Sequence, residues 1–457
     1  MKLVLLSGGS GKRLWPLSND ARSKQFLKVL KSETGFESMV QRVWGQIESV
    51  GLSHSTVIAT SKSQVEMIQS QLNNQPGLII EPCRRDTFPA IVLAASYIYT
   101  VKEASLDEVV AVLPVDPYVN KAFFNKVKEL ESVVNEKNAD LVLMGVQPTY
   151  PSSKYGYIVP KEGSKEDECL KVSRFTEKPT VEVAKELIEN GALWNCGVFA
   201  FKLGYLINIL EEKGLPTQYD DLLKQYDQLP KISFDYEVVE KTKNIVVLPY
   251  NGYWKDLGTW NTLTEEMDTI QIGKGVISED SENTHLINEL DIPVTVLGVS
   301  NVVVAVSPDG ILVADKDESP RIKELVDSFD NRPMYEERRW GWYRVLDHTK
   351  IDGAHEVITK RIGIKAGSNL SYQYHFQRSE VWTIIKGEGI FAHNDKLQVV
   401  RPGDVLQIGV GESHALKAVT ELEMIEVQSG TQLIEEDIVR VYMTWEEVEQ
   451  HCYSLNI

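Results

Sequence analysis

The chain has 457 residues, of which 42% are hydrophobic and 25% are charged, a composition typical of a folded globular protein. Its length suggests about three domains. With 66 acidic against 48 basic residues, the net charge of −18 argues against a nucleic-acid partner or an anionic membrane surface. No segment approaches the ~20 apolar residues of a membrane span, and the four cysteines form no C-x-x-C pair. We therefore expect a cytoplasmic protein with reduced thiols.

The first predicted element is a short buried strand over residues 3–6. It leads into a loop that is rich in glycine and closed by basic residues: Gly8, Gly9, Gly11, Lys12 and Arg13. The glycines let several backbone N–H groups turn inward and bind an anion. Arg13 stands where a Walker A loop needs Ser or Thr, and Leu14 stands where the dinucleotide fingerprint needs its third glycine. The loop is therefore a phosphate site of another kind, or a plain glycine turn.

A second basic group follows at Arg22, Lys24 and Lys28. Together the two segments resemble the signature of nucleotide-sugar pyrophosphorylases. More narrowly, they resemble the mannose-1-phosphate guanylyltransferases, which have Thr at the position of Lys12 and Pro at that of Ser23. The resemblance implies that the basic cluster binds a nucleoside triphosphate and a sugar phosphate, both of them anions, against an acidic background. The alternative interpretation of the cluster is a solvated surface face.

The pattern of predicted elements divides the chain into three parts. Over residues 1–270, strand-like runs such as 109–114 and 141–146 alternate with helical patterns such as 123–135. This alternation predicts an α/β fold with βαβ units, and with the resemblance a Rossmann-like nucleotidyltransferase domain with a mostly parallel sheet. Short β-branched runs predict a β-rich connector over 271–335, and the strand-rich remainder, 336–457, predicts a small barrel.

Two aspartates of the first part are candidate metal ligands. Asp116 follows an apolar strand, at the end of the strand where open α/β sheets bind ligands, and Asp256 lies in a second motif, Trp254-Lys-Asp-Leu-Gly-Thr-Trp260. By resemblance both hold Mg²⁺, whose preferred ligands are hard oxygen atoms. The family usually has His after the first aspartate, whereas this chain has Pro117. The alternative for each aspartate is an ordinary turn or N-cap residue.

The same resemblance assigns substrate contacts along the first part. Nine residues are expected to contact the nucleotide: Leu6, Gly8, Gly9, Ser10, Gly11, Lys12, Arg85, Asp86 and Pro114. Six are expected to bind the sugar phosphate: Gly145, Tyr157, Glu177, Lys178, Asn195 and Gly197. Asp86 replaces the more usual Asn. Any single motif could be a surface turn, but their common order along the chain favours the family.

These parts imply a reaction without a general base, because the attacking phosphate oxygen of a sugar 1-phosphate is already an anion. It attacks the α-phosphorus of the nucleoside triphosphate in line, and pyrophosphate leaves. Arg13 and Lys24 are the expected catalytic residues, since they neutralise the charge that grows in the transition state.

Two stretches of the last part, residues 367–387 and 403–414, match the spacing of the two cupin motifs. They supply four candidate ligands of a second metal: Gln373, His375, Glu380 and His414. This mixed nitrogen and oxygen set suits Zn²⁺ or another first-row divalent ion. The part resembles the mannose-6-phosphate isomerase module of bifunctional guanylyltransferases, which often have His at the positions of Gln377 and Val381. An active isomerase, a bound metal without turnover and a purely structural barrel therefore all stay open.

The resemblance predicts an enzyme that makes GDP-mannose and pyrophosphate from GTP and mannose 1-phosphate. One alternative keeps the chemistry but uses another sugar 1-phosphate, such as that of a heptose, since Lys12, Asp86 and Pro117 depart from the usual pattern. Another is a regulatory protein that senses nucleotide sugars. We also expect a homodimer, because β-rich connectors and barrels offer strand edges that pair.

Overall fold

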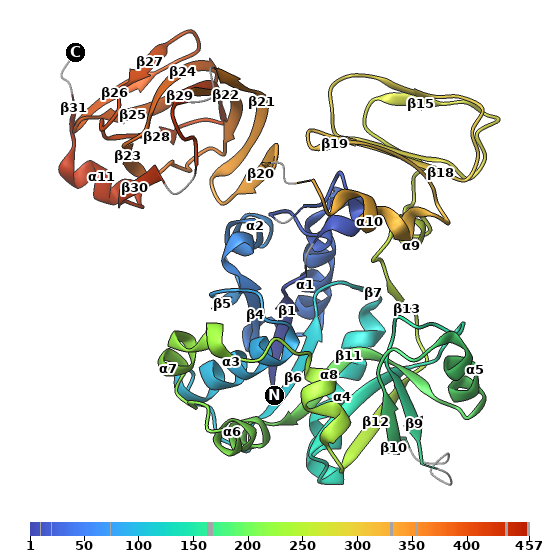
Figure 1. The fold of residues 1–457 in the computed structure, drawn as a ribbon. Helices are drawn as coiled ribbons and strands as arrows, with labels where there is room; N and C mark the ends of the chain where they lie inside the picture. Colours follow the sequence, from blue (N-terminus) through green and yellow to red (C-terminus); the bar gives the residue numbers. More distant parts are fainter. Residues whose placement is uncertain are drawn as a thin grey trace.

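The computed structural model describes residues 1–9, 11–19, 21–73, 75–161, 168–329, 332–351, 355–434 and 437–454. Figure 1 shows three successive parts: an α/β part that contains the N-terminus, a small all-β part coloured yellow, and a barrel coloured orange to red. The α/β part lies below the other two in this view.

A nine-stranded sheet forms the centre of the α/β part. Its strands lie in the order β5 (Gly77–Glu81), β4 (Thr56–Ser61), β1 (Lys2–Ser7), β6 (Val109–Pro114), β11 (Leu193–Lys202), β8 (Leu141–Val146), β12 (Ile245–Tyr250), β10 (Leu170–Thr176) and β9 (Tyr157–Pro160). The first four strands are parallel, as are β8 and β12, whereas β11 runs antiparallel to β6 and β8 on either side. Because β11 is reversed, its first residues lie at the edge of the sheet where β6 and β8 end.

Helices cover both faces of this sheet because successive residues of each buried strand point to opposite sides. Leu3 and Leu5 belong to a buried core that also includes residues of α1 (Met39–Ser49), α2 (Val65–Gln71), α4 (Lys121–Lys137) and α5 (Val181–Glu189). Val4, on the other face, packs with α3 (Thr87–Thr100), α6 (Leu203–Glu212), α7 (Tyr219–Lys224) and α8 (Phe234–Glu237). A capping box between Ser38 and Gln41 starts α1. The strands and helices that the sequence predicts in this part are therefore confirmed.

Short elements complete the α/β part. The hairpin of β2 (Leu30–Ser32) and β3 (Gly35–Glu37) precedes α1, and β7 (Pro117–Val119) pairs antiparallel with β13 (Trp254–Asp256). The helix α9 (Trp260–Thr264) then leads into the second part.

The second part is a small parallel β-helix. β14 (Gln271–Ile272), β16 (His285–Asn288) and β18 (Val302–Ser307) form one parallel sheet, and β15 (Gly275–Ile277) pairs in parallel with β17 (Val294–Val296). The chain thus alternates between two sheets with each coil. Leu286, Val296, Val304 and Val306 fill the interior. β19 (Gly310–Asp315) ends the stack by pairing antiparallel with β18, and α10 (Ile322–Val326) follows.

The third part is a barrel of two six-stranded sheets, as the cupin pattern predicts. One sheet has the order β20 (Tyr335–Arg338), β21 (Gly341–Ile351), β22 (His355–Ile364), β29 (Leu422–Gly430), β24 (Arg378–Lys386) and β27 (Val405–Ile408). The other has the order β30 (Ile438–Tyr442), β23 (Tyr372–His375), β28 (His414–Ala418), β25 (Gly389–His393), β26 (Lys396–Val400) and β31 (Tyr453–Ser454). The helix α11 (Trp445–His451) follows β30. Along β29 the buried positions include Glu426 and Gln428, so polar side chains face the barrel interior.

Candidate active site

Two aspartates meet beyond the carboxyl ends of the central strands. Asp116 lies just after β6, and Asp256 ends β13, whose pairing with β7 places Asp256 opposite Pro117. Lys24, in the short 3-10 helix Lys24–Phe26, reaches both carboxylates. Its Nζ atom is 2.9 Å from Asp116 Oδ2 and 2.8 Å from Asp256 Oδ1. Three residues that are far apart in the sequence therefore share one ionic centre.

The charges of this centre stabilise one another. Burial alone would lower the pKa of Lys24, but Asp116 and Asp256 outweigh burial and hold this pKa above its ordinary value. Burial would likewise raise the pKa of Asp256, yet the Lys24 ammonium outweighs it and keeps the pKa of this carboxyl below its usual range. At neutral pH Lys24 is therefore charged and Asp256 is ionised.

The glycine-rich loop is fixed from behind by buried polar side chains. Ser23 Oγ donates to the carbonyl oxygen of Gly9 at 2.7 Å and accepts a hydrogen bond from Gln64 Nε2 at 2.7 Å. A Cβ atom on Gly11 would lie 2.7 Å from the carbonyl oxygen of Asn19, so this position requires glycine. Ser23 thus supports the loop at the position where the family has proline. The predicted contact Ser10 lies outside the described residues.

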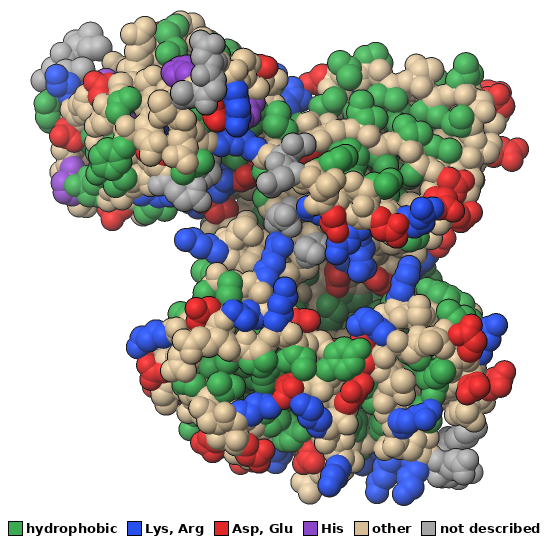
Figure 2. Space-filling model, viewed as in Figure 1, with side chains coloured by type: hydrophobic (Ala, Val, Ile, Leu, Met, Phe, Trp, Pro, Cys, Tyr) green, Lys and Arg blue, Asp and Glu red, His purple; other side chains and the backbone are tan. Residues whose placement is uncertain are grey.

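The loop and the ionic centre open onto a cleft of about 540 Å³. Ten of the predicted site residues line it: Gly9, Gly11, Lys12, Arg13, Lys24, Pro114, Asp116, Lys178, Asn195 and Asp256. In Figure 2, Lys and Arg side chains gather around a recess in the middle of the visible face, between the α/β part and the two parts above it. The volume is typical of a small-ligand site, and the cations around it suit an anionic ligand.

Acceptors and donors for a polyhydroxy ligand lie beside this cleft. Glu177 forms an ion pair with Lys178, while its buried Oε2 atom has no hydrogen-bond partner among the described residues. A Cβ atom on Gly156 would collide with that oxygen, so only glycine leaves room for the carboxylate. Asn195 Nδ2 donates to Asp235 Oδ1 at 2.7 Å. Burial, together with the charge of Glu177, raises the pKa of Asp235 to about 7.

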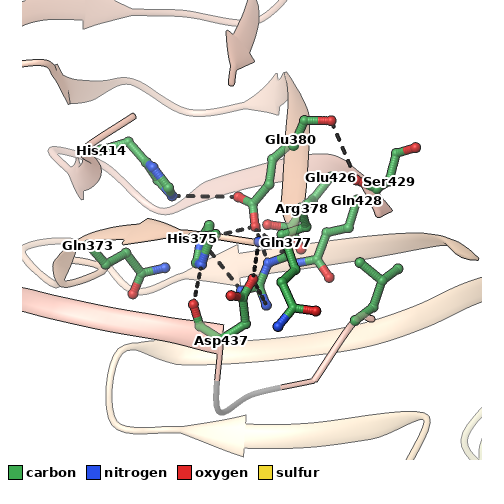
Figure 3. Close-up of polar contacts among 12 residues, drawn as sticks. Gln373, His375, Gln377, Arg378, Glu380, His414, Glu426, Gln428, Ser429 and Asp437 are labelled. Atoms are coloured by element: carbon green, nitrogen blue, oxygen red, sulfur yellow. Dashed lines mark hydrogen bonds and ion pairs between the residues drawn. The ribbon is translucent and has the colours of Figure 1, made fainter. Parts of the chain in front are cut away.

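A second polar cluster lies inside the barrel. Figure 3 shows His375 of β23, Glu380 of β24 and His414 of β28 converging, and one possible ligand atom from each lies within 4.8 Å of the others. His414 Nδ1 is 2.9 Å from the carbonyl oxygen of Glu412, which requires the proton on Nδ1 and leaves Nε2 as a lone pair. This Nε2 atom is buried and has no hydrogen-bond partner in the described structure. His375 Nδ1 is similarly placed 3.3 Å from the carbonyl oxygen of Asp437.

Electrostatics keep this barrel cluster in the protonation state that metal binding needs. Burial lowers the pKa of His375 to about 4 and also lowers that of His414, so both imidazoles are neutral near pH 7. Although burial opposes ionisation of Glu380, His414 and His375 in their protonated forms, together with the Arg378 guanidinium, lower its pKa to about 2. Gln373 and Glu380 both line a cavity in the barrel, but the amide oxygen of Gln373 accepts a hydrogen bond of 2.7 Å from Ser371.

Comparison with known proteins identifies the family of the first part of the chain. Residues 2–272, more than half of the chain, match the Nucleotidyl transferase family. A Xanthomonas campestris protein, the xanthan biosynthesis protein XanB, is 32% identical over 97% of this chain and 98% of its own length. A Salmonella typhimurium relative, the mannose-1-phosphate guanylyltransferase RfbM, is 31% identical over 96% of both chains. The chain belongs to the mannose-1-phosphate guanylyltransferase family.

The β-helix and the barrel of this guanylyltransferase-family chain each match a further protein family. Residues 274–329 match the family described as a MannoseP isomerase/GMP-like beta-helix domain, and residues 330–443 match the mannose-6-phosphate isomerase C-terminal family. A solved structure from Thermus thermophilus, described as a mannose-1-phosphate geranyltransferase, is 29% identical, covers 72% of this chain and all of its own, and superposes with a TM-score of 0.61. Within the described residues, no helix combines the length and apolar character needed to cross a membrane.

Several predicted substrate residues of this nucleotidyl transferase do not line the cleft. Tyr157 is fully buried and its hydroxyl bonds the backbone of Ser152, and Asp86 caps α3 at the backbone N–H of Thr87. Arg85 donates to the carbonyl oxygen of Leu229. Four more predicted residues are also not among those that line the cleft: Leu6, Gly8, Gly145 and Gly197.

Five residues that were not among the predicted site residues also line the cleft: Thr87, Pro117, Cys196, Trp254 and Lys323. Lys323 is the least expected because it belongs to α10, after the β-helix, and comes from outside the first part of the chain. Nothing in its local sequence marks it as a site residue, and only the packing of α10 against the helix Lys12–Leu14 brings it here.

Proposed function

We propose that the chain transfers a guanylyl group from GTP to mannose 1-phosphate and releases pyrophosphate. The ionic centre of Lys24, Asp116 and Asp256 carries this proposal, because it faces the cleft that Arg13 and the glycine-rich loop also line. The choice of GTP and mannose 1-phosphate is supported by the names of relatives that match this chain over nearly its whole length.

The two aspartates fit a divalent cation. Both carboxylates already converge on a single positive charge, the Lys24 ammonium, at 2.8–2.9 Å, and carboxylate oxygens are ligands that Mg²⁺ prefers. Asp116 and Asp256 would hold the ion. When bound, Mg²⁺ would supply the positive charge that neutralises the phosphates.

The remaining groups of the cleft position the two substrates and neutralise charge. Backbone N–H groups at Gly9 and Gly11 cradle the triphosphate, and Arg13 and Lys24 stabilise negative charge at the α-phosphate. Lys178 binds the phosphate of mannose 1-phosphate, which presents its anionic oxygen to the α-phosphorus without loss of a proton. The unpartnered Oε2 atom of Glu177 and the Asn195 amide bind sugar hydroxyls.

A direct assay tests this function. Purified protein is incubated with GTP, mannose 1-phosphate and Mg²⁺, and released pyrophosphate and GDP-mannose are measured. The same assay with ATP, CTP and UTP, and with glucose 1-phosphate and a heptose 1-phosphate, tests the base and the sugar. Faster turnover of another sugar 1-phosphate would change the substrate, and no turnover with any pair would contradict the transferase function.

For the barrel we propose a metal-dependent mannose-6-phosphate isomerase, favoured by the buried cluster of His375, Glu380 and His414. Two neutral imidazoles and a carboxylate suit Zn²⁺ or another first-row divalent ion, which would polarise a substrate oxygen. The cavity is also lined by basic side chains that suit a phosphate: Lys360, Arg378 and Arg440. Val381 stands at a position where relatives often have His. Its side chain is exposed, so having Val instead of His at this position takes no ligand away from the buried cluster.

Conversion of mannose 6-phosphate to fructose 6-phosphate tests the isomerase function. Turnover that disappears in Glu380→Gln but persists in Asp256→Asn would place the activity in the barrel. Metal binding without turnover would leave the barrel as a metal site alone.

We also propose a cytoplasmic location, since all four cysteines are free thiols. We further propose that the protein is a homodimer, and light scattering would measure the number of chains per particle.

A further inference from the structure

A third cleft, of about 490 Å³, lies where the three parts of the chain meet, and it shares no lining residue with the two sites above. Arg22 contributes from the segment after the glycine-rich loop, Glu289 from the β-helix, and Tyr335, Trp342 and Arg344 from the first hairpin of the barrel. Its volume is in the range of small-molecule sites.

An aromatic surface is already in place along this cleft. The rings of Tyr335 and Trp342 are stacked, with centroids 6.4 Å apart and planes 27° apart. Trp342 lies opposite Gly363 on the neighbouring strand, and a Cβ atom there would come within 2.5 Å of the indole. The glycine therefore allows the indole to lie flat against the sheet. A ring held in this way loses little conformational entropy when it stacks on a ligand.

An uncompensated positive charge lies on the same hairpin. Arg344 is directly opposite Arg361 across β21 and β22, and two like charges in this arrangement are destabilising. Glu423 offsets Arg361 through hydrogen bonds of 2.9 and 2.6 Å. The half-buried Arg344 side chain has no ion pair or hydrogen bond within the described residues, so an anion would offset the remaining charge.

We propose that this third cleft binds a nucleotide, with its base stacked on Trp342 and its phosphates at Arg344 and Arg361. A planar aromatic ligand gains from stacking on an indole, and phosphate groups match the guanidinium fork. Asp291 also lines the cleft and is a suitable acceptor for ribose hydroxyls.

The cleft is linked to the transfer site through Arg22. The guanidinium of Arg22 forms a two-pronged ion pair with Glu289, with both N–O distances at 2.9 Å, and lies 5.3 Å from the centre of the Tyr335 ring. Arg22 precedes Lys24 by two positions in the chain. A ligand that displaces or tightens these contacts therefore acts on the segment that carries Lys24, which makes the nucleotide an effector of the transfer reaction.

Binding stoichiometry tests this proposal. Equilibrium dialysis of the full chain with GDP, GDP-mannose and, separately, mannose 1-phosphate measures ligand bound per chain. Wild type should bind about two molecules of GDP or GDP-mannose, and Arg344→Ala and Trp342→Ala about one. Arg401→Ala removes an exposed charge elsewhere in the barrel and should keep both sites. Circular dichroism and thermal unfolding establish that the variants are folded.

The outcomes separate this inference from the proposed transferase function. Equal stoichiometry of about one in wild type and Arg344→Ala would overturn the third-cleft site. A value of about one in wild type that falls to zero in Arg344→Ala would support the site and contradict nucleotide binding at the transfer site. Binding of mannose 1-phosphate but of neither guanine nucleotide to the third cleft would overturn the nucleotide assignment. Product inhibition by GDP-mannose that is purely competitive with GTP in wild type would overturn the link to Lys24.

Discussion

Lys24 and Asp256 form an ion pair of 2.8 Å although 232 positions separate them in the chain. The pairing of β13 with β7 brings Asp256 to the end of β6, and the buried hydrogen bonds behind the glycine-rich loop hold the segment that carries Lys24. The site is therefore assembled from both ends of the α/β part. Its charge balance depends on all three members, since Lys24 also contacts Asp116.

Asp256→Asn should reduce kcat of GDP-mannose synthesis by about 10²–10³-fold, the usual cost of losing one preorganised charge-stabilising group. The variant should also need more Mg²⁺ for half its maximal rate, because one carboxylate ligand is gone. Steady-state kinetics across a Mg²⁺ titration measure both effects. Asp221→Asn, on the exposed face of α7, should behave like wild type. A near-normal rate for Asp256→Asn at every Mg²⁺ concentration would refute its role.

Lys323→Ala tests the contribution of α10 to the cleft. Loss of one exposed cation near the triphosphate should raise KM for GTP about fivefold, which corresponds to about 1 kcal/mol, and leave kcat within about twofold. Lys274→Ala removes a comparable exposed charge from the β-helix and should leave KM unchanged. An unchanged KM in Lys323→Ala would show that this side chain does not contact the nucleotide.

Ser23→Ala should destabilise the loop that binds the triphosphate. The change leaves the Gly9 carbonyl without its 2.7 Å partner and removes an acceptor from Gln64, at a cost of about 1–3 kcal/mol in the free energy of unfolding. Urea denaturation measures this loss, and KM for GTP should rise with it. The exposed Ser49, replaced by alanine, is the control. Equal unfolding midpoints for Ser23→Ala and wild type would contradict this account.

Asp235 makes stability depend on pH. Its folded pKa of about 7 lies above the ordinary value of 3.8, so between these values the folded chain holds a proton that the unfolded chain has released. The stabilisation from this proton is fully present below about pH 4, falls progressively as pH rises from 4 to 7, and is absent above 7, a total loss of up to about 4 kcal/mol. Asp235→Asn, which resembles the protonated acid, should therefore raise Tm near pH 8 and change it little near pH 4. Thermal unfolding without substrate measures the difference, and equal effects at both pH values would disprove it.

The barrel should carry about one first-row metal ion per chain, held by His375, Glu380 and His414. His414→Gln should lower the metal content at least tenfold, because it removes the buried Nε2 atom whose lone pair would bind the metal. His393→Gln, whose imidazole pairs with Glu412 near the surface, should retain the metal. Elemental analysis of purified protein distinguishes these outcomes. Metal retained in His414→Gln at the wild-type level would exclude this cluster as the site.

The local pattern of apolar and polar residues was sufficient to predict most of the secondary structure. The alternation of apolar strands with amphipathic helices predicts the elements of the α/β part, because burial on a sheet face imposes that pattern on neighbouring residues. The β-branched runs at 294–297 and 302–306 predict β17 and β18 but do not reveal that they belong to stacked coils. The coil arrangement depends on which strands pair, and strand pairing is a property of residues far apart in sequence.

The same distinction between local pattern and distant contacts applies to the candidate sites. Motif and spacing selected Lys24, Asp116 and Asp256 as candidate reactive groups and His375, Glu380 and His414 as candidate ligands, and the structure brings the members of each set together. Residue order along the chain could not show that Lys24 would bridge both aspartates. Nor could it show that Lys323 would reach the cleft, or that Arg344 would lack a partner, because each depends on contacts between residues that are far apart in the chain. The amino-acid sequence by itself determined which chemistry this protein carries, through local backbone needs and side-chain type. Only the tertiary structure decided which charges meet, because electrostatic attraction and burial act over distances in space and not along the chain.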